Sequence, residues 1–190
     1  MCPHFHIPLQ SGDDGILKKM HRPYSSRFFK EVVLKINEML PDAAIGVDIL
    51  VGFPGESTTA FERTCHIIEK LPVSYLHVFP FSPRKGTPAY HFPDKLPTDI
   101  VRQRCRIIRE IGNLKRSVFY QKFIGRELEI IIEDRRGTPL GYRRGTTANY
   151  VPVLVKDSGT LSQSQEPVNI TIEKVNNDLR VFGKSSALQT

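Results

Sequence analysis

The chain has 190 residues, of which 39% are hydrophobic, and this suits one ordinary domain or two small ones with a real core. Its 27 lysines and arginines outnumber its 20 acidic residues, and the resulting charge of +7 favours a polyanionic partner without requiring one. No stretch approaches the roughly 20 apolar residues of a membrane span, and the N-terminus lacks a signal pattern. We therefore expect a soluble protein of the cytoplasm with no membrane contact.

Strands and helices alternate through the first part of the chain. Met1, Cys2 and Pro3 run straight into a strand with no cap before it, and we therefore expect the chain to be part of something longer. The expected elements are a strand ending near residue 10, helices over 13–22 and 25–40, a strand over 43–53, a helix over 59–71 and a strand over 75–81. This order predicts a parallel sheet whose ligand-facing loops lie at the carboxyl edge.

Helix starts follow from side chains that can accept hydrogen bonds from free backbone N–H groups. Ser25 or Ser26 is expected to cap the helix over 25–40. Thr59 and Glu62 have the spacing of a capping box for the next helix.

A Pro-rich irregular loop over residues 80–97 leads into the longest helix, expected over 97–123. Its apolar positions are expected inside: Ile100, Val101, Ile107, Ile108, Ile111, Leu114 and Val118. Its other face is strongly basic and carries Arg102, Arg104, Arg106, Arg109, Lys115, Arg116 and Lys122. Solvated surface charge is the simpler interpretation of this face, and anion binding is the alternative.

The pattern changes at Gly125. Short segments with strand character follow at 127–133, 148–155, 168–175 and 179–182, separated by turn signals. Short strands within about 65 residues predict a small barrel. We therefore expect an α/β domain over residues 1–124 and an all-β domain over residues 125–190.

Polar groups follow each of the three strands in the α/β part. Gln10 and Ser11, with an exposed backbone beside them, suit ligand hydroxyls such as those of a ribose. Arg22 could hold a carboxylate or phosphate, and Ser82, Arg84 and Lys85 form a third polar cluster. Such loops would share one site.

Glycine and acidic residues mark the middle loop. Gly52 and Gly55 allow close approach of the backbone to a ligand. Glu56 either contacts a ligand or simply precedes a helix. Asp48 lies inside a buried strand, so it needs a partner or a function, and its type leaves an ion pair and a site role equally open.

Cysteines and histidines give no metal site. Cys2, Cys65 and Cys105 are far apart and odd in number, which fits packing residues with reduced thiols rather than a disulfide framework or zinc site. His4 and His6 alternate on one strand and could form a metal pair, but strand histidines with local partners are the simpler interpretation. Neither a P-loop nor a Ser-His-Asp set is present in the sequence.

Four segments together closely resemble the methylthiotransferases of the radical S-adenosylmethionine class. They are residues 4–12 (HFHIPLQSG), 17–25 (LKKMHRPYS), 48–56 (DILVGFPGE) and 81–89 (FSPRKGTPA). The resemblance implies the second half of a partial (β/α) barrel with parallel strands, followed by a TRAM domain, a small antiparallel, OB-like β-barrel that binds RNA.

Two further segments point to one branch of that family. Residues 77–84 (HVFPFSPR) and 149–153 (NYVPV) look most like the branch that adds a methylthio group to C2 of N6-threonylcarbamoyladenosine, next to the anticodon of tRNA. The branches that act on isopentenyladenosine or on a ribosomal protein are the alternatives within the family.

The resemblance also implies where the ligands bind. It places S-adenosylmethionine beside Gln10, Ser11, Arg22, Val51, Gly52, Phe53, Phe79 and Phe81. It assigns the phosphates of the tRNA anticodon loop to Lys115, Arg116, Arg135, Arg136, Arg143 and Arg144.

The cysteines depart from the family pattern. The family uses a Cys-xxx-Cys-xx-Cys loop and three further cysteines for two [4Fe-4S] clusters, and Cys2, Cys65 and Cys105 do not match that spacing. We therefore expect neither cluster nor catalytic residues in this chain, inactivity without an N-terminal half of the enzyme, and self-association through an uncovered sheet edge. A noncatalytic RNA-binding protein is the alternative from another class.

Overall fold

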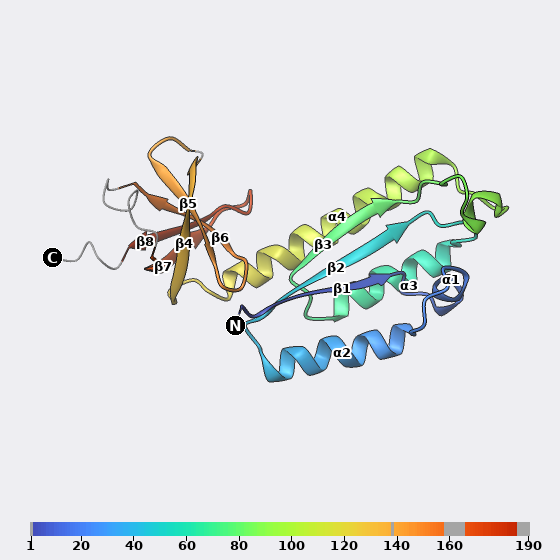
Figure 1. Ribbon diagram of the computed structural model, residues 1–190, viewed down its shortest axis with the longest axis horizontal. Helices are drawn as coiled ribbons and strands as arrows, with labels where there is room; N and C mark the ends of the chain where they lie inside the picture. Colours follow the sequence, from blue (N-terminus) through green and yellow to red (C-terminus); the bar gives the residue numbers. More distant parts are fainter. Residues whose placement is uncertain (1, 138, 158–165, 186–190) are drawn as a thin grey trace. The chain divides into compact units, whose positions relative to one another are not determined.

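The computed structural model describes residues 2–137, 139–157 and 166–185, except for the side chains of 134–137 (Figure 1). By its internal contacts the chain divides into two compact units, Phe5–Lys115 and a second made of Met1–His4 with Arg116–Thr190. The predicted fold class, an α/β part followed by a small β-barrel, is confirmed. The predicted domain bounds, 1–124 and 125–190, stay a prediction.

The α/β part is built on a three-stranded sheet in the order β1-β2-β3. Its strands are β1 (His4–Gln10), β2 (Ala44–Val51) and β3 (Tyr75–Pro80), which point the same way in Figure 1. The helices are α1 (Asp14–Lys19), α2 (Ser26–Met39), α3 (Thr58–Lys70), the 3-10 turn η1 (Pro88–His91) and α4 (Thr98–Gln121). The predicted parallel sheet is thus present, and β2 pairs with β3 from Gly46 opposite Tyr75 to Val51 opposite Pro80.

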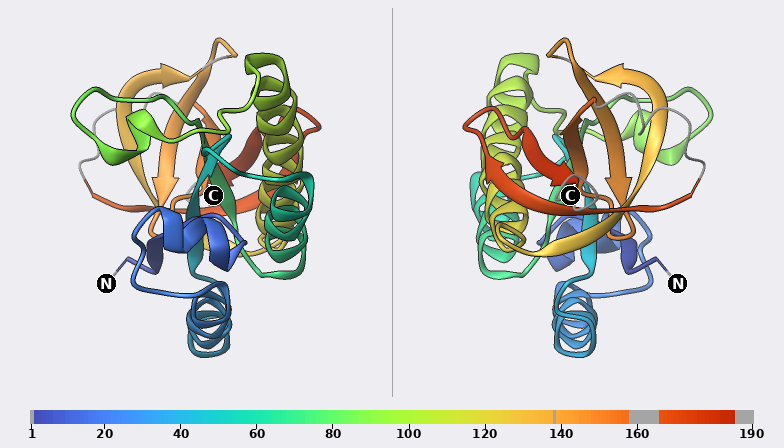
Figure 2. Two further views of the ribbon diagram at one scale, coloured as in Figure 1. Left: turned by 90° about the vertical axis from the view of Figure 1, so that its right-hand side faces the viewer. Right: turned by 90° about the vertical axis from the view of Figure 1, so that its left-hand side faces the viewer.

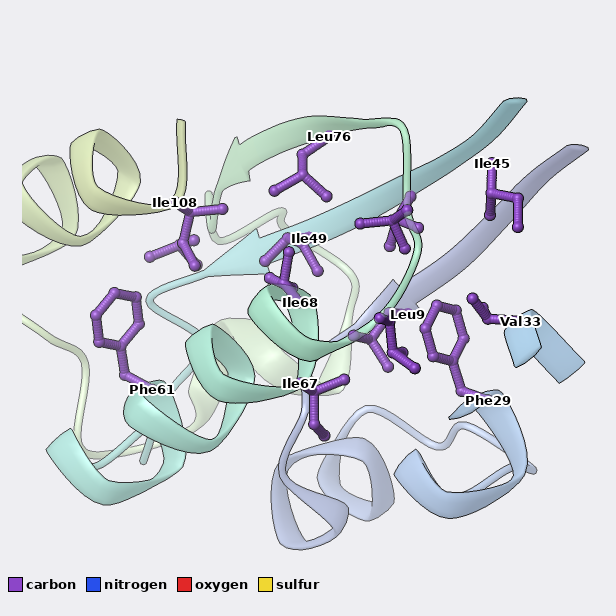
Figure 3. Packing of buried hydrophobic residues seen from close by; sticks show 14 of the residues in the cluster. Leu9, Phe29, Val33, Ile45, Ile49, Phe61, Ile67, Ile68, Leu76 and Ile108 are labelled. Carbon is purple, nitrogen blue, oxygen red and sulfur yellow. The ribbon is translucent and has the colours of Figure 1, made fainter. Parts of the chain in front are cut away.

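One face of this sheet forms the hydrophobic core. Side chains at alternate positions of β2, including Ile45 and Ile49, point to the helices because strand residues alternate between faces (Figure 3). They pack against residues from the three longer helices: Phe29 and Val33 of α2, Phe61, Ile67 and Ile68 of α3, and Cys105 and Ile108 of α4. Burial of this face fixes the register of the strands, since a slip by one residue would turn every side chain over.

Helix capping agrees with the prediction at one helix and differs at another. The Ser25 side chain accepts a hydrogen bond from the Phe28 N–H, 3.2 Å away, as predicted for α2. On α3 the predicted box of Thr59 and Glu62 is wrong, because Ser57 is the N-cap and accepts from the Ala60 N–H at 3.1 Å. Ser57 has the extended backbone that a capping residue needs.

The inward face of α4 agrees with its apolar pattern at Val101, Ile107, Ile108 and Ile111, which pack in or against the core, but not beyond them. Leu114 and Val118 were expected inside but are 69% and 63% exposed. The side toward the sheet instead carries Ile108 and then Gly112, whose ideal Cβ position lies 3.2 Å from Leu76 Cβ. Positions 108 and 112 are one turn apart, so 114 and 118 lie to the side of that face.

The second unit contains a closed barrel in the order β4-β5-β6-β8-β7, and its strands are drawn in yellow to red in Figure 2. Its strands are β4 (Glu127–Gly137), β5 (Tyr142–Thr147), β6 (Pro152–Lys156), β7 (Val168–Val175) and β8 (Val181–Ser185). Neighbouring strands are antiparallel except for β6 and β8, which are parallel, so the barrel is mixed and not wholly antiparallel as predicted. The sequence pattern missed β5, where Arg143, Arg144 and Gly145 interrupt any apolar alternation.

No helix in the described part of the chain is both long enough and apolar enough to cross a membrane.

The loop after β2 is held by a buried ion pair. The Glu56 carboxylate accepts a hydrogen bond from the Gly52 N–H and lies 3.2 Å from the Arg104 guanidinium of α4, which also donates to the Glu56 carbonyl at 2.8 Å. Arg104 stacks over Phe61, with 5.0 Å between the guanidinium and the ring centroid. Burial raises the pKa of Glu56, and the Gly52 and Arg104 interactions only partly offset it. Arg104 therefore belongs to the interior rather than to the basic surface predicted for α4.

The loop after β1 is held by a second carboxylate. Asp13 caps α1 by accepting from the Ile16 N–H at 3.0 Å and pairs with Arg63 of α3 at 2.7 Å. Burial acts to raise the pKa of Asp13, but these hydrogen bonds and the Arg63 charge together hold it below its ordinary value.

Removing one partner of the buried pair should destabilise the protein more than removing both. Arg104→Met and Glu56→Gln should each lower the free energy of unfolding by about 3 kcal/mol, because each leaves a buried polar or charged group uncompensated. The double variant should lose less than the sum of the two. Urea unfolding of the single and double variants measures this coupling.

The exposed pair Arg27 and Glu31 of α2 is the matched control, with side chains 87% and 59% exposed. Removing it should change the free energy of unfolding by less than about 1 kcal/mol. Additive losses at Glu56 and Arg104 would show that the two residues are not coupled.

Asp13→Asn should give a pH-dependent loss of stability. Because the folded pKa of Asp13 lies below its ordinary value of 3.8, its charge stabilises the fold above that value and ceases to do so as the pH falls through the folded pKa. The variant should lose about 0.5 to 1 kcal/mol at neutral pH, and the difference from wild type should shrink in acid. Urea unfolding across pH tests this, with the exposed Glu62→Gln as control, and a constant difference would contradict the assignment.

Candidate functional site

The three strands of the sheet bring three loops to one edge. Gln10 ends β1, Val51 ends β2 and Phe79 lies one residue before the end of β3. Leu50 is opposite Phe79 in the register, and the Phe81 N–H donates to the Val51 carbonyl at 2.7 Å. The residues predicted to follow the strands therefore gather at the carboxyl edge.

The first loop turns its polar groups toward its own backbone. Ser11 is only 3% exposed, and its hydroxyl accepts from the Asp13 N–H at 3.2 Å. Gly12 donates to Thr64 Oγ1 at 2.9 Å, and a Cβ there would lie 2.6 Å from Thr64 Cα. The backbone is thus buried against α3 and not exposed as predicted. Gln10, half-buried with a φ of 66°, lies at the start of this turn, and its contact with a cofactor stays a prediction.

The second loop forms an aromatic wall. Gly52 has a φ of 84°, and a Cβ there would lie 2.6 Å from Val101, so no larger residue fits without movement. Phe53 is 4% exposed and meets Phe81 and Phe92 edge to face, with ring centroids 5.2 and 6.0 Å apart. Phe79 is 50% exposed.

A hollow of about 230 Å³ opens beside this wall. Its lining includes Arg22 and Phe53, which the sequence predicted, together with Leu50, Ala89 and Phe92. Gln10, Ser11 and Phe79 are not among its lining residues. No individual site residue was predicted within 87–92, although 87–89 lie in a segment that carries the family resemblance, and the local signal there is the Pro88 that begins the 3-10 turn η1.

The sheet face opposite the helices carries a cluster of polar side chains. His6 Nε2 lies 2.8 Å from Asp48 Oδ1, and His77 Nδ1 lies 3.6 Å from the same oxygen. One residue comes from each strand, and Asp48 and His77 are direct partners in the register. Asp48 therefore interacts with two imidazole rings. The possibility that His4 and His6 form a metal pair stays a prediction.

The cysteines do not form a cluster-binding set. Cys65 lies on α3, Cys105 is buried on α4, and Cys2 precedes β1 in the other compact unit. Burial, together with the nearby Glu69 charge, raises the pKa of the Cys65 thiol to about 11. Iron–sulfur clusters need several thiolates around one point, and among the described residues of either unit no group of three metal-binding side chains includes a cysteine.

The predicted RNA-binding residues differ in how far they are free to meet phosphate. Arg143 is 15% exposed and pairs with Asp157 at 3.3 Å, whereas Arg144 is 53% exposed and pairs with Glu133 at 3.3 Å. Lys115 donates to the carbonyls of Glu69 and Leu71, and burial lowers its pKa.

The remaining basic residues also differ in how accessible they are. Arg116 is half-buried and has a partner of its own. The side chains of Arg135 and Arg136 lie outside the described residues. On α4 the exposed residues Arg102, Arg106 and Arg109 line a shallow hollow of about 460 Å³, so part of the basic face predicted for this helix is available to an anion.

Comparison with known proteins finds relatives that are named as tRNA methylthiotransferases or as synthases of a methylthio-adenosine of tRNA. It is 43% identical over 137 residues to the threonylcarbamoyladenosine tRNA methylthiotransferase MtaB of Aquifex aeolicus, a match that covers 72% of this chain and 33% of the relative. It is 38% identical over 153 residues to the MtaB of Rickettsia prowazekii, covering 80% and 34%. It is also 38% identical over 137 residues to the tRNA-2-methylthio-N(6)-dimethylallyladenosine synthase of Corynebacterium urealyticum, covering 72% and 25%.

No protein-family model matches the chain. The chain spans about a third of the length of the MtaB relatives that it matches. Identity of 37% to 43% over most of this chain nevertheless shows that it belongs to the methylthiotransferase family, and the match of 43% is to a relative named MtaB.

Proposed function

We propose that this chain is the part of a tRNA methylthiotransferase that holds one side of the cofactor pocket and contacts tRNA. The reaction is addition of a methylthio group to C2 of N6-threonylcarbamoyladenosine next to the anticodon. The observation that carries this proposal is the 43% identity to a relative named for that substrate. The gathering of three ligand-facing loops at one sheet edge supports it.

S-adenosylmethionine is the cofactor of this proposal. Phe81, the more accessible ring of the aromatic wall, would contact adenine, and the exposed Arg22 guanidinium suits a carboxylate. The hollow that Arg22 and Phe53 line, about 230 Å³, is smaller than the roughly 300 Å³ or more of a typical ligand pocket, so it would hold part of the molecule. Val51, Gly52 and Phe79 would border the remainder at the same edge. When bound, the cofactor supplies the radical chemistry and the methyl group.

The two [4Fe-4S] clusters would be held elsewhere in the enzyme. The cysteines of this chain do not fit a cluster, and the MtaB relatives are about three times as long as the matched region. We therefore expect the chain to need that further portion for activity. We also expect it to act in the cytoplasm and, when separated from the further portion, to self-associate through the edges of its open sheet.

The tRNA surface of this proposal uses charges that remain accessible. Arg144, half-exposed on β5, can reach phosphate while its neighbour Arg143 is engaged with Asp157. Lys115 is also engaged, so its predicted part in RNA binding would be indirect. Arg102, Arg106 and Arg109 of α4 offer a second basic surface.

Binding of the chain to tRNA tests the proposal. A tRNA carrying N6-threonylcarbamoyladenosine should bind, and its affinity should fall linearly with salt on logarithmic axes as counterions are released. The same tRNA without this modification, a tRNA carrying isopentenyladenosine and a ribosomal protein are the comparison ligands. Preference for the tRNA carrying isopentenyladenosine or for the ribosomal protein would assign the chain to another branch of the family. Equal binding of every RNA would favour a noncatalytic RNA-binding protein.

A charge reversal at Arg144 tests the tRNA surface. Arg144→Glu should weaken binding and reduce the salt slope by about 1 to 2, because a phosphate contact is lost. Arg180→Glu is the matched control, since Arg180 is 49% exposed and also pairs with an acid of the same unit. An unchanged slope in Arg144→Glu, or an equal loss in Arg180→Glu, would contradict the assignment.

A further inference from the structure

We propose that His6, Asp48 and His77 form a binding site for a divalent transition-metal cation of the zinc type. The three side chains come from neighbouring strands and meet on the sheet face opposite the helical core. This site uses no cysteine, and it is separate from the hollow at the carboxyl edge, whose lining contains none of the three residues. It goes beyond the proposed function and does not depend on it.

The distances fit a metal centre after small adjustments. Zinc binds imidazole nitrogen and carboxylate oxygen at about 2.0 to 2.2 Å, so the ligand atoms around a tetrahedral ion lie about 3.3 Å apart. The observed separations are 2.8 Å from His6 Nε2 to Asp48 Oδ1 and 3.6 Å from His77 Nδ1 to that oxygen, which bracket this value. One ligand atom from each residue lies within 4.8 Å of the other two. The two exposed imidazole rings would have to turn toward each other to complete the geometry.

The chemistry of the donors selects the class of ion. Two imidazoles suit zinc, copper, iron and nickel, whereas magnesium and calcium prefer sites made only of oxygen. The Asp48 carboxylate brings a negative charge that offsets part of the charge of the cation. Three protein ligands leave at least one coordination position open, as in catalytic zinc sites, so water or a ligand atom could complete the coordination.

The sheet holds these side chains in place. Asp48 is the direct register partner of His77, so the backbone fixes their spacing. The His6 and His77 rings lie 5.1 Å apart, and the Tyr75 ring lies 5.3 Å from His77. Gly46 makes room for Tyr75, because a Cβ at that position would lie 2.2 Å from the tyrosine ring.

Access to the cluster is open. The side chains of His6, His77 and Asp48 are 36%, 50% and 22% exposed. A cation can therefore reach the ligand atoms, and the aromatic neighbour limits how far the imidazoles can turn away.

Metal titration of the whole 190-residue chain tests the site. After treatment with a chelator, the protein should bind one equivalent of Zn²⁺ in a calorimetric titration. Co²⁺ should give visible ligand-field bands without sulfur-to-metal charge transfer, because cysteine is not among the ligands. His6→Ala, His77→Ala and Asp48→Asn should each weaken binding by at least about tenfold.

His66→Ala and His91→Ala are the matched controls, since both histidines are exposed and lie on α3 and η1, away from the cluster. They should leave the affinity unchanged. Absence of stoichiometric binding, an effect of the controls equal to that of the cluster variants, or cobalt bands that reveal sulfur ligation would overturn the proposal.

A measurement on the unsubstituted protein covers the case in which a variant fails to fold. In ¹⁵N-resolved NMR spectra of histidine side chains, addition of Zn²⁺ should move the imidazole signals of His6 and His77 and leave those of His66 and His91 in place. Signals of His6 and His77 that do not move at one equivalent of Zn²⁺ would also overturn the proposal.

Discussion

The buried Glu56 carboxylate is the interaction on which the arrangement of the carboxyl edge depends. It accepts from the backbone of Gly52 just beyond β2 and pairs with Arg104 of α4, so one charged group joins a turn to a helix that begins 42 positions further on than Glu56. Because both partners are buried, neither can be satisfied by water if the other moves. The aromatic wall around Phe53 and the hollow beside it follow from the position of that turn.

The two faces and the carboxyl edge of the parallel sheet carry different kinds of residue. Its helical face is filled by Ile45, Ile49 and their helix partners, which leaves no room for polar chemistry there. Its carboxyl edge carries the loops proposed to hold the cofactor. Its other face carries the His6, Asp48 and His77 cluster, whose members could meet only because neighbouring strands run in register. The proposed cofactor pocket and metal site are thus two consequences of one arrangement of strands.

Residue type predicted the candidate site less well than it predicted the fold. Ser11 offers a hydroxyl as expected, yet Asp13 N–H uses it. Arg143 and Arg144 are adjacent and chemically identical, and each pairs with an acid, but Arg143 is 15% exposed and Arg144 is 53% exposed. Adjacent strand residues point to opposite faces, and only the tertiary structure determines which face meets a partner. Lys115 likewise carries a charge that the sequence assigns to the surface, and the structure directs it to backbone carbonyls.

The sequence by itself determined the alternation of strands and helices, the change to a barrel near Gly125, a serine cap at residue 25 or 26 and the family, because these depend on local periodicity and contiguous motifs. Only the tertiary structure decided that His77 joins His6 and Asp48, that Arg104 lies inside, and that Leu114 and Val118 lie outside. These outcomes depend on strand register and on the rotation of a helix about its axis. Both are set by packing between segments far apart in the chain, which no local pattern encodes.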